Sequence, residues 1–167
     1  MDETAARGAL LAEVKRGEGR RSTLLVLDAV PIHSLWIARH LHLLLELDLT
    51  VVIPTTIRAI FAARQDCRKG REVLAFLDRH TPPLVIRPCG PRELLDGLRH
   101  EMSDASTGSV FGLVGSSAVW PEGGAAQNMH LVDVRDLAAV AEHVGLLENM
   151  LEIAHAIELP GEVVAWR

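Results

Sequence analysis

Two short apolar runs constrain the fold of this chain most. Each run ends at a polar residue or a proline and is followed by a helical pattern. The first run is Leu24–Leu27, which ends at Asp28. The second run, Leu49–Ile53, is rich in β-branched residues and ends at Pro54. Short apolar runs of this kind are typical of strands buried on both faces, as in parallel sheets. We therefore expect strands and helices to alternate along the chain.

The rest of the sequence continues this alternation without a visible internal repeat. Pro31 is predicted to open a helix that runs to about Glu46. Further strands are predicted at residues 84–87, 110–114 and 131–132, and further helices at about residues 4–16, 57–64, 71–79, 91–101, 136–143 and 146–159. This order predicts an α/β fold, a three-layer α/β/α arrangement around a central, mostly parallel sheet.

The N-terminal residues are set apart by the segment Gly17–Arg21, whose composition is that of a linker. We expect residues 1–21 to form a loosely tied helix and this linker, and residues 22–167 to form the main domain. A chain of 167 residues is long enough to bury a full hydrophobic core.

Charge is distributed unevenly between the two parts of the chain, whose formal net charge is −5. Residues 1–100 hold 15 Lys and Arg against 12 Asp and Glu, whereas residues 101–167 hold 2 against 10. The first part could therefore face RNA or an acidic protein, whereas the second part repels phosphate. Charge alone does not predict a strong nucleic-acid binder.

The densest local group of cations is Arg64, Arg68, Lys69 and Arg71, which we call the basic patch. It could bind RNA phosphate or an acidic protein surface. No aromatic residue for stacking on bases lies between its members, which weakens the single-stranded RNA interpretation. A solvated loop is the alternative.

Neither a membrane span nor a secretion signal is visible. No apolar stretch reaches the roughly 18 residues of a membrane span, and the first twenty residues lack the apolar core of a signal peptide. The two cysteines, Cys67 and Cys89, form no local metal motif and are expected to be free thiols. A cytoplasmic location follows, with a nuclear one as the alternative, and no membrane partner is expected.

From Asp28 onward the pattern resembles the PIN domain, and it is most similar to the PIN domains of the SMG proteins of nonsense-mediated mRNA decay. Shared features are a strand ending in Asp, then Thr50–Ile57 (Thr-Val-Val-Ile-Pro-Thr-Thr-Ile), the basic loop Arg64–Arg71 and a helix like Glu72–Asp78. A later Leu-Val-Asp-Val-Arg-Asp-Leu segment, Leu131–Leu137, completes them. The resemblance covers about residues 22–100 and resumes near residues 130–157.

The resemblance implies a ribonuclease site in which several carboxylates bind one or two Mg²⁺ or Mn²⁺ ions. Asp28 matches the first of these acids, Asp104 is the candidate for a middle acid, and Asp133 stands one residue before the expected last acid. That last position holds Val134, and the glutamate expected in the helix after Pro54 falls on Ile60 or Ala59. The polar residue expected after the first acid is Ala29.

Because a one-residue shift turns a strand side chain to the opposite face, Asp133 is expected to point away from such a site. The resemblance therefore implies a degenerate PIN-like domain: a protein or RNA interaction module in RNA metabolism, possibly in nonsense-mediated mRNA decay. Its partner would be a protein of an RNA-processing or decay complex, with weak RNA binding possible and no cofactor expected. The rival is an active Mg²⁺- or Mn²⁺-dependent endoribonuclease that uses Asp28, Asp104 and Asp133, with metal at Asp28 and Asp133.

Other patterns are weighed against ordinary structural roles. Glu148, Glu152 and His155 share a helical stripe, which is typical of a solvated face. The segment Gly112–Ser117 could bind phosphate, as in a small-molecule-binding α/β domain, but favours a tight turn. Three histidines, His33, His40 and His42, are not spaced to chelate one ion on a helix. Trp36 is expected in the core, and Trp120 and Trp166 on the surface.

Overall fold

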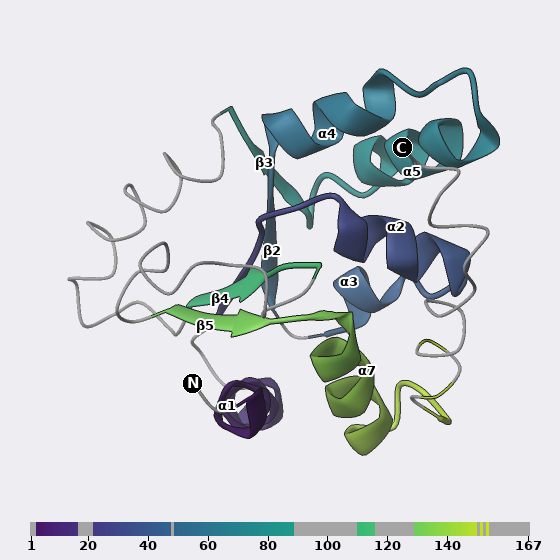
Figure 1. Ribbon diagram of the computed structural model, residues 1–167. Helices are drawn as coiled ribbons and strands as arrows, with labels where there is room; N and C mark the ends of the chain where they lie inside the picture. Colours follow the sequence, from purple (N-terminus) through teal and green to yellow (C-terminus); the bar gives the residue numbers. More distant parts are fainter. Residues whose placement is uncertain are drawn as a thin grey trace.

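The central feature of the computed structural model is a five-stranded sheet, in order β3-β2-β1-β4-β5, whose strand pairings are all parallel (Figure 1). The structure describes residues 3–16, 22–47, 49–88, 110–115, 129–149, 151 and 153. The strands are β1 (Thr23–Val26), β2 (Thr50–Pro54), β3 (Val85–Arg87), β4 (Val110–Leu113) and β5 (Met129–Val132). The predicted three-layer α/β/α fold is confirmed.

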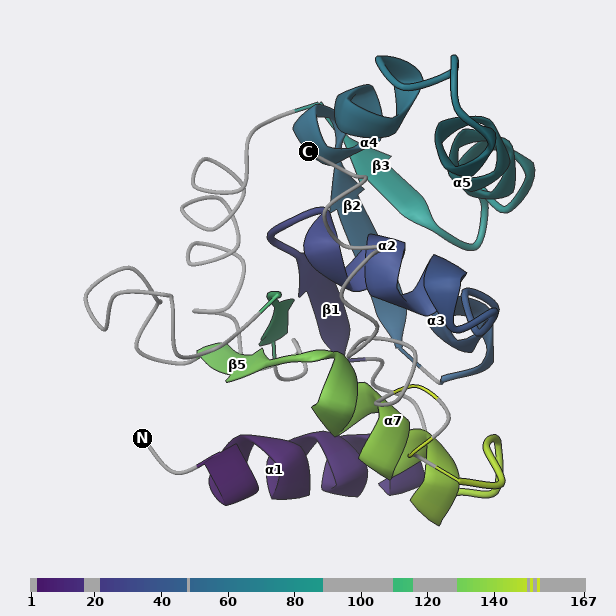
Figure 2. The same ribbon diagram turned by 45° about the vertical axis from the view of Figure 1, so that its right-hand side comes forward.

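Within the described residues, six helices accompany the sheet. They are α1 (Glu3–Arg16), α2 (Val30–Ile37), α3 (Leu43–Glu46), α4 (Thr55–Ala62), α5 (Arg68–Arg79) and α7 (Val134–His143). Helix α2 lies between α5 and α7, and it contacts both (Figure 2). The helices predicted at residues 91–101 and 146–159 lie outside the described residues, apart from residues 146–149, 151 and 153.

Strand β1 is the centre of the core, as its apolar sequence predicts. Leu24, Leu25 and Val26 are fully buried, so both faces of the strand are covered. Fully burying a side chain of this size contributes about 2 kcal/mol through the hydrophobic effect. Parallel neighbours on both sides, β2 and β4, then satisfy the backbone of β1.

Helix α1 is a packed part of this core, so the expectation of a loosely tied N-terminal helix is wrong. Leu10 is fully buried and Ala6 is 4% exposed. The helix lies against α7 and β5 (Figure 1). Its Arg7 Nε donates to Asp136 Oδ1 at 2.8 Å. The linker-like sequence after α1 hid this packing, because the contacts join segments more than 100 residues apart.

The helix predicted from Pro31 to Glu46 is interrupted. Helix α2 ends at Ile37, and Arg39 adopts a left-handed conformation with φ of 61°. A second short helix, α3, begins only at Leu43. The apolar pattern continues across the break, so periodicity alone could not reveal it.

Helix α5 begins three residues earlier than predicted, at Arg68. Cys67 precedes it as the N-cap, and its Sγ accepts the Gly70 N–H at 3.4 Å. Gly70 lies in the first turn of α5, directly against the backbone of Arg64. A β-carbon at Gly70 would overlap the Arg64 carbonyl, so only glycine fits here.

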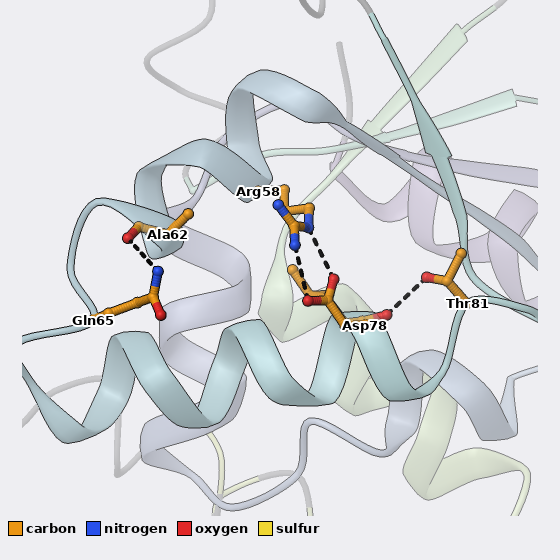
Figure 3. A network of polar contacts seen from close by, with 6 residues as sticks. Arg58, Ala62, Gln65, Asp78 and Thr81 are labelled. Atoms are coloured by element: carbon orange, nitrogen blue, oxygen red, sulfur yellow. Dashed lines mark hydrogen bonds and ion pairs between the residues drawn. The ribbon is translucent and has the colours of Figure 1, made fainter.

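Helices α4 and α5 are joined by a bidentate ion pair (Figure 3). Arg58 Nε donates to Asp78 Oδ1 at 2.9 Å, and Arg58 Nη2 donates to Asp78 Oδ2 at 2.8 Å. These hydrogen bonds lower the pKa of Asp78 and raise that of Arg58. In the turn between the helices, Gln65 Nε2 donates to the Ala62 carbonyl at 3.0 Å.

Candidate functional site

Asp28 lies at the switch point of the sheet, where open α/β sheets place their ligand crevice. The chain runs from β1 outward to β2 and β3, and returns to add β4 and β5 on the other side of β1. Val26 pairs with Leu113, and the Leu27 N–H donates to the Leu113 carbonyl at 2.9 Å. This register brings Asp28 beside Gly115, just beyond the carboxyl ends of β1 and β4.

Both carboxylate oxygens of Asp28 accept backbone hydrogen bonds at this point. Asp28 Oδ1 accepts the Val30 N–H at 2.7 Å, and Oδ2 accepts the Gly115 N–H at 2.9 Å. A β-carbon at Gly115 would lie 3.0 Å from Oδ2 and from the Val30 Cβ, so glycine permits this close approach. Asp28 therefore fastens the start of α2 and the end of β4 together.

Asp133 has a structural role at the end of β5. It is the N-cap of α7: its side chain accepts the Asp136 N–H at 3.1 Å, and the Asp136 side chain accepts the Asp133 N–H at 3.0 Å. Strand β5 ends at Val132, as predicted, and α7 begins at Val134. The strand alternation used to orient Asp133 relative to Val134 therefore does not apply. Val134, in the place of the expected acid, is 4% exposed.

Asp28 and Asp133 follow strands separated by β4. Since neighbouring strands lie about 4.8 Å apart, the backbones at these two strand ends are about 10 Å apart. Each carboxylate is bonded to its own helix start, and no group of three or more potential metal ligands occurs among the described residues. Asp104 lies outside those residues. The described acids therefore do not fit a shared Mg²⁺ or Mn²⁺ ion, which needs several oxygen ligands around it.

The remaining positions at which the resemblance implies an acid or a polar residue hold apolar residues. Ile60 is on α4 and 40% exposed, beside exposed Ala59, and Ala29 is 8% exposed. In the segment Gly112–Ser117, for which phosphate binding was the alternative to a tight turn, Gly112 lies within β4, and the Gly115 N–H is already bonded to Asp28. That N–H is not available to a phosphate.

The four side chains of the basic patch differ in exposure: Arg64, Arg68 and Arg71 are exposed, whereas Lys69 is buried. Arg68 Nε donates to Glu72 Oε1 at 2.8 Å, and Arg71 Nη1 donates to the backbone carbonyls before α5. Lys69 is 9% exposed and its Nζ lies 5.5 Å from the centre of the Trp36 ring, while Arg64 is exposed. The patch is thus mainly the first turn of α5, not a basic loop.

Trp36 is half-buried and packs against the edge of the hydrophobic core, so its expected place in the core is confirmed in part. Its indole N–H donates to Glu72 Oε2 at 2.9 Å. Hydrogen bonds from Arg68 and from this indole lower the pKa of Glu72. Trp36 also lines an open groove of about 650 Å³ between α2 with its following turn and α5, which we call the α2–α5 groove. Its wall includes Trp36, Ile37, Arg39, Leu41, Arg68 and Phe76.

Sequence reasoning missed this groove because it depends on the break after α2. A continuous helix from Pro31 to Glu46 would have carried Arg39 and Leu41 along the helix instead of across the groove. The sequence gives little sign of this break, because helices usually end at a glycine and this one ends at Arg39-His40.

Among the other positions considered, those within the described residues form no group of three or more metal-ligating side chains. His33 is buried within α2, and the rings of His40 and His42 lie 5.4 Å apart after that helix. Glu148 is exposed, whereas Glu152, His155, Trp120 and Trp166 lie outside the residues whose side chains are described.

Comparisons with protein-family models, with curated proteins and with solved structures find no match to the chain. Membership of the PIN family therefore stays a prediction from the sequence. Among the described helices, none combines the length and apolar character that a membrane crossing requires.

Proposed function

We propose that the chain is a catalytically degraded PIN-like domain that acts as a protein and RNA interaction module in RNA metabolism. The process proposed for it is nonsense-mediated mRNA decay, in which the most similar PIN domains act. Its proposed partner is a subunit of an RNA-processing or decay complex, and its proposed location is the cytoplasm or the nucleus. The family comes from the sequence resemblance. The observation that supports the loss of catalysis is the hydrogen bonding of Asp28, whose two oxygens accept the N–H groups of Val30 and Gly115.

This hydrogen bonding argues against catalysis because a catalytic acid at this site would have to bind a metal ion. A catalytic acid of a metal-dependent nuclease directs its oxygens at the ion, which then activates water and stabilises charge on the phosphate. Asp28 instead joins β4 to α2, and Asp133 caps α7. The two candidate acids among the described residues, Asp28 and Asp133, thus each stabilise the end of a strand and the start of a helix.

The rival function, an Mg²⁺- or Mn²⁺-dependent endoribonuclease, is favoured by one observation only, the place of Asp28 at the switch point of the sheet. A labelled 30-nucleotide single-stranded RNA incubated with the full chain and Mn²⁺ separates the two. We expect no cleavage above that in EDTA. Cleavage that EDTA abolishes would establish the rival function. This test uses only the wild-type chain, so it does not depend on the stability of an Asp28 variant.

The interaction role is tested by tethering the chain to a reporter mRNA through a phage coat-protein fusion. We expect the half-life of the reporter to fall at least twofold, to the same extent for wild type and for Asp28→Asn at matched protein levels. An unchanged half-life with wild type would refute the proposed function. Matched protein levels are needed because Asp28→Asn is also expected to lower stability.

A further inference from the structure

The turn that ends α2 has an arginine at a position that usually holds glycine. The Arg39 N–H donates to the Trp36 carbonyl at 3.0 Å, and the His40 N–H donates to the Leu35 carbonyl at 2.9 Å. These two bonds, with φ of 61° at Arg39, form a Schellman motif whose left-handed residue is Arg39. An L-residue with a β-carbon loses about 1 kcal/mol there relative to glycine.

The guanidinium of Arg39 has nothing in the described structure to compensate that cost. Arg39 is exposed on the wall of the α2–α5 groove, and no hydrogen bond or ion pair to its side chain occurs among the described residues. The other polar side chains of the groove have partners within the chain: Arg68 pairs with Glu72, and His42 Nε2 lies 3.8 Å from Glu46 Oε2. Arg39 is therefore the cation of this groove that is open to an outside anion.

Next to Arg39 the groove offers a rigid apolar wall. Trp36, Ile37 and Phe76 are half-buried, and Leu41 is 8% exposed. Trp36 is fixed on two sides, by its indole N–H bond to Glu72 and by the Lys69 ammonium over its ring. A fixed aromatic side chain loses little conformational entropy on binding, which favours its use as an anchor.

Charge decides between a peptide and an RNA as the occupant. RNA would bring a phosphate with every nucleotide past the carboxylate of Glu72 on the groove wall, and the chain as a whole carries a net charge of −5. The Lys69 ammonium also lies over the Trp36 ring, where a base would have to stack. A peptide, in contrast, needs only one carboxylate, which can pair with Arg39.

From this geometry we infer that the α2–α5 groove binds a short peptide segment of a partner protein that carries an apolar side chain beside an Asp or Glu. The carboxylate pairs with Arg39, and the apolar side chain packs against Trp36, Ile37 and Phe76. The inference rests on the proposed function in that it gives the interaction module its protein-binding surface.

The test is selection of a phage-displayed library of random dodecapeptides on the full chain. We expect enriched sequences to place Asp or Glu next to an apolar residue. Their affinity should fall about tenfold in Arg39→Gly, because a charge-assisted pair is lost. Glycine suits the left-handed position, so this variant should fold at least as stably as wild type. Arg79→Gln, an exposed arginine on α5 outside the groove wall, is the matched control and should change affinity less than twofold.

Several results would overturn the inference. They are no enrichment, enriched peptides without an acid, or peptides that bind Arg39→Gly as tightly as wild type. Binding of a labelled single-stranded RNA that Arg39→Gly abolishes would make the groove an RNA site. Self-association that Arg39→Gly abolishes would make it an interface between copies of the chain. Reporter decay in the tethering assay, which does not depend on selected peptides, would still stand in each of these cases.

Discussion

The carboxyl end of β1 and the α2–α5 groove are both places where this fold could hold a ligand, and they use their polar groups in opposite ways. At the strand end, both oxygens of Asp28 are bonded to backbone N–H groups of the chain itself. In the groove, the guanidinium of Arg39 is exposed although its backbone conformation is unfavourable. Position in a fold therefore marks a possible site, but hydrogen bonding decides whether its groups are available to a ligand.

The largest effect is expected on the groove side, from Gly70→Ala. The added β-carbon would overlap the Arg64 backbone, so the first turn of α5 has to shift, and we expect a loss of about 3 kcal/mol in the free energy of unfolding. Urea denaturation measures it. Gly8→Ala is the matched control, since nothing lies within 4 Å of that position on α1, and it should stabilise by about 0.5 kcal/mol. Equal effects at the two glycines would show that the contact between Gly70 and Arg64 is wrong.

At the strand end, Asp28→Asn is expected to cost about 2 kcal/mol, because an amide nitrogen would face one of the two backbone N–H donors. Denaturation at neutral pH measures the loss. Asp66→Asn, at an exposed position in the turn before α5, should stay within about 0.5 kcal/mol of wild type. If Asp28→Asn leaves stability unchanged or raises it, Asp28 is not a structural link, and the contrast between the two regions fails.

A smaller effect is expected from Gly115→Ala, about 1 kcal/mol, since the new methyl group would lie 3.0 Å from Asp28 Oδ2 and the Val30 side chain can move by a few tenths of an ångström. Hydrogen exchange of the Val30 amide provides a local measurement. That amide should exchange faster in the variant, whereas amides in the middle of α5 should not. Uniformly faster exchange would mean a general loss of stability instead of a weakened Asp28 contact.

The smallest effect is expected from the surface pair of Arg58 and Asp78, at about 0.5 kcal/mol. The folded protein lowers the pKa of Asp78 from its ordinary value of 3.8, so the contribution is complete above that value and is lost as the pH falls through the lower folded-state pKa. The stability difference between wild type and Arg58→Gln should thus be present at pH 6 and vanish in acid. A difference that persists in acid would assign the effect to packing of the arginine side chain.

The fold was largely predictable because its signals are local. The apolar runs at β1 and β2 and the helical pattern of α7 identified buried strands and an amphipathic helix. Element ends were predicted less well where one residue overrides a continuing pattern, as at Arg39, or where a cap extends a helix, as at Cys67. The candidate sites were harder still, since each depends on contacts between separate segments.

By itself, the sequence determined the alternating α/β fold, the placement of Asp28 at a strand end and the surplus of basic residues near α5. These follow from the order of apolar and polar side chains along short stretches of chain. Only the tertiary structure decided that Asp28 accepts the N–H of Gly115, 87 residues away, and that α1 packs on α7. It also decided that Arg39 faces an apolar groove, because pairing and packing join distant segments through geometry that no local pattern encodes.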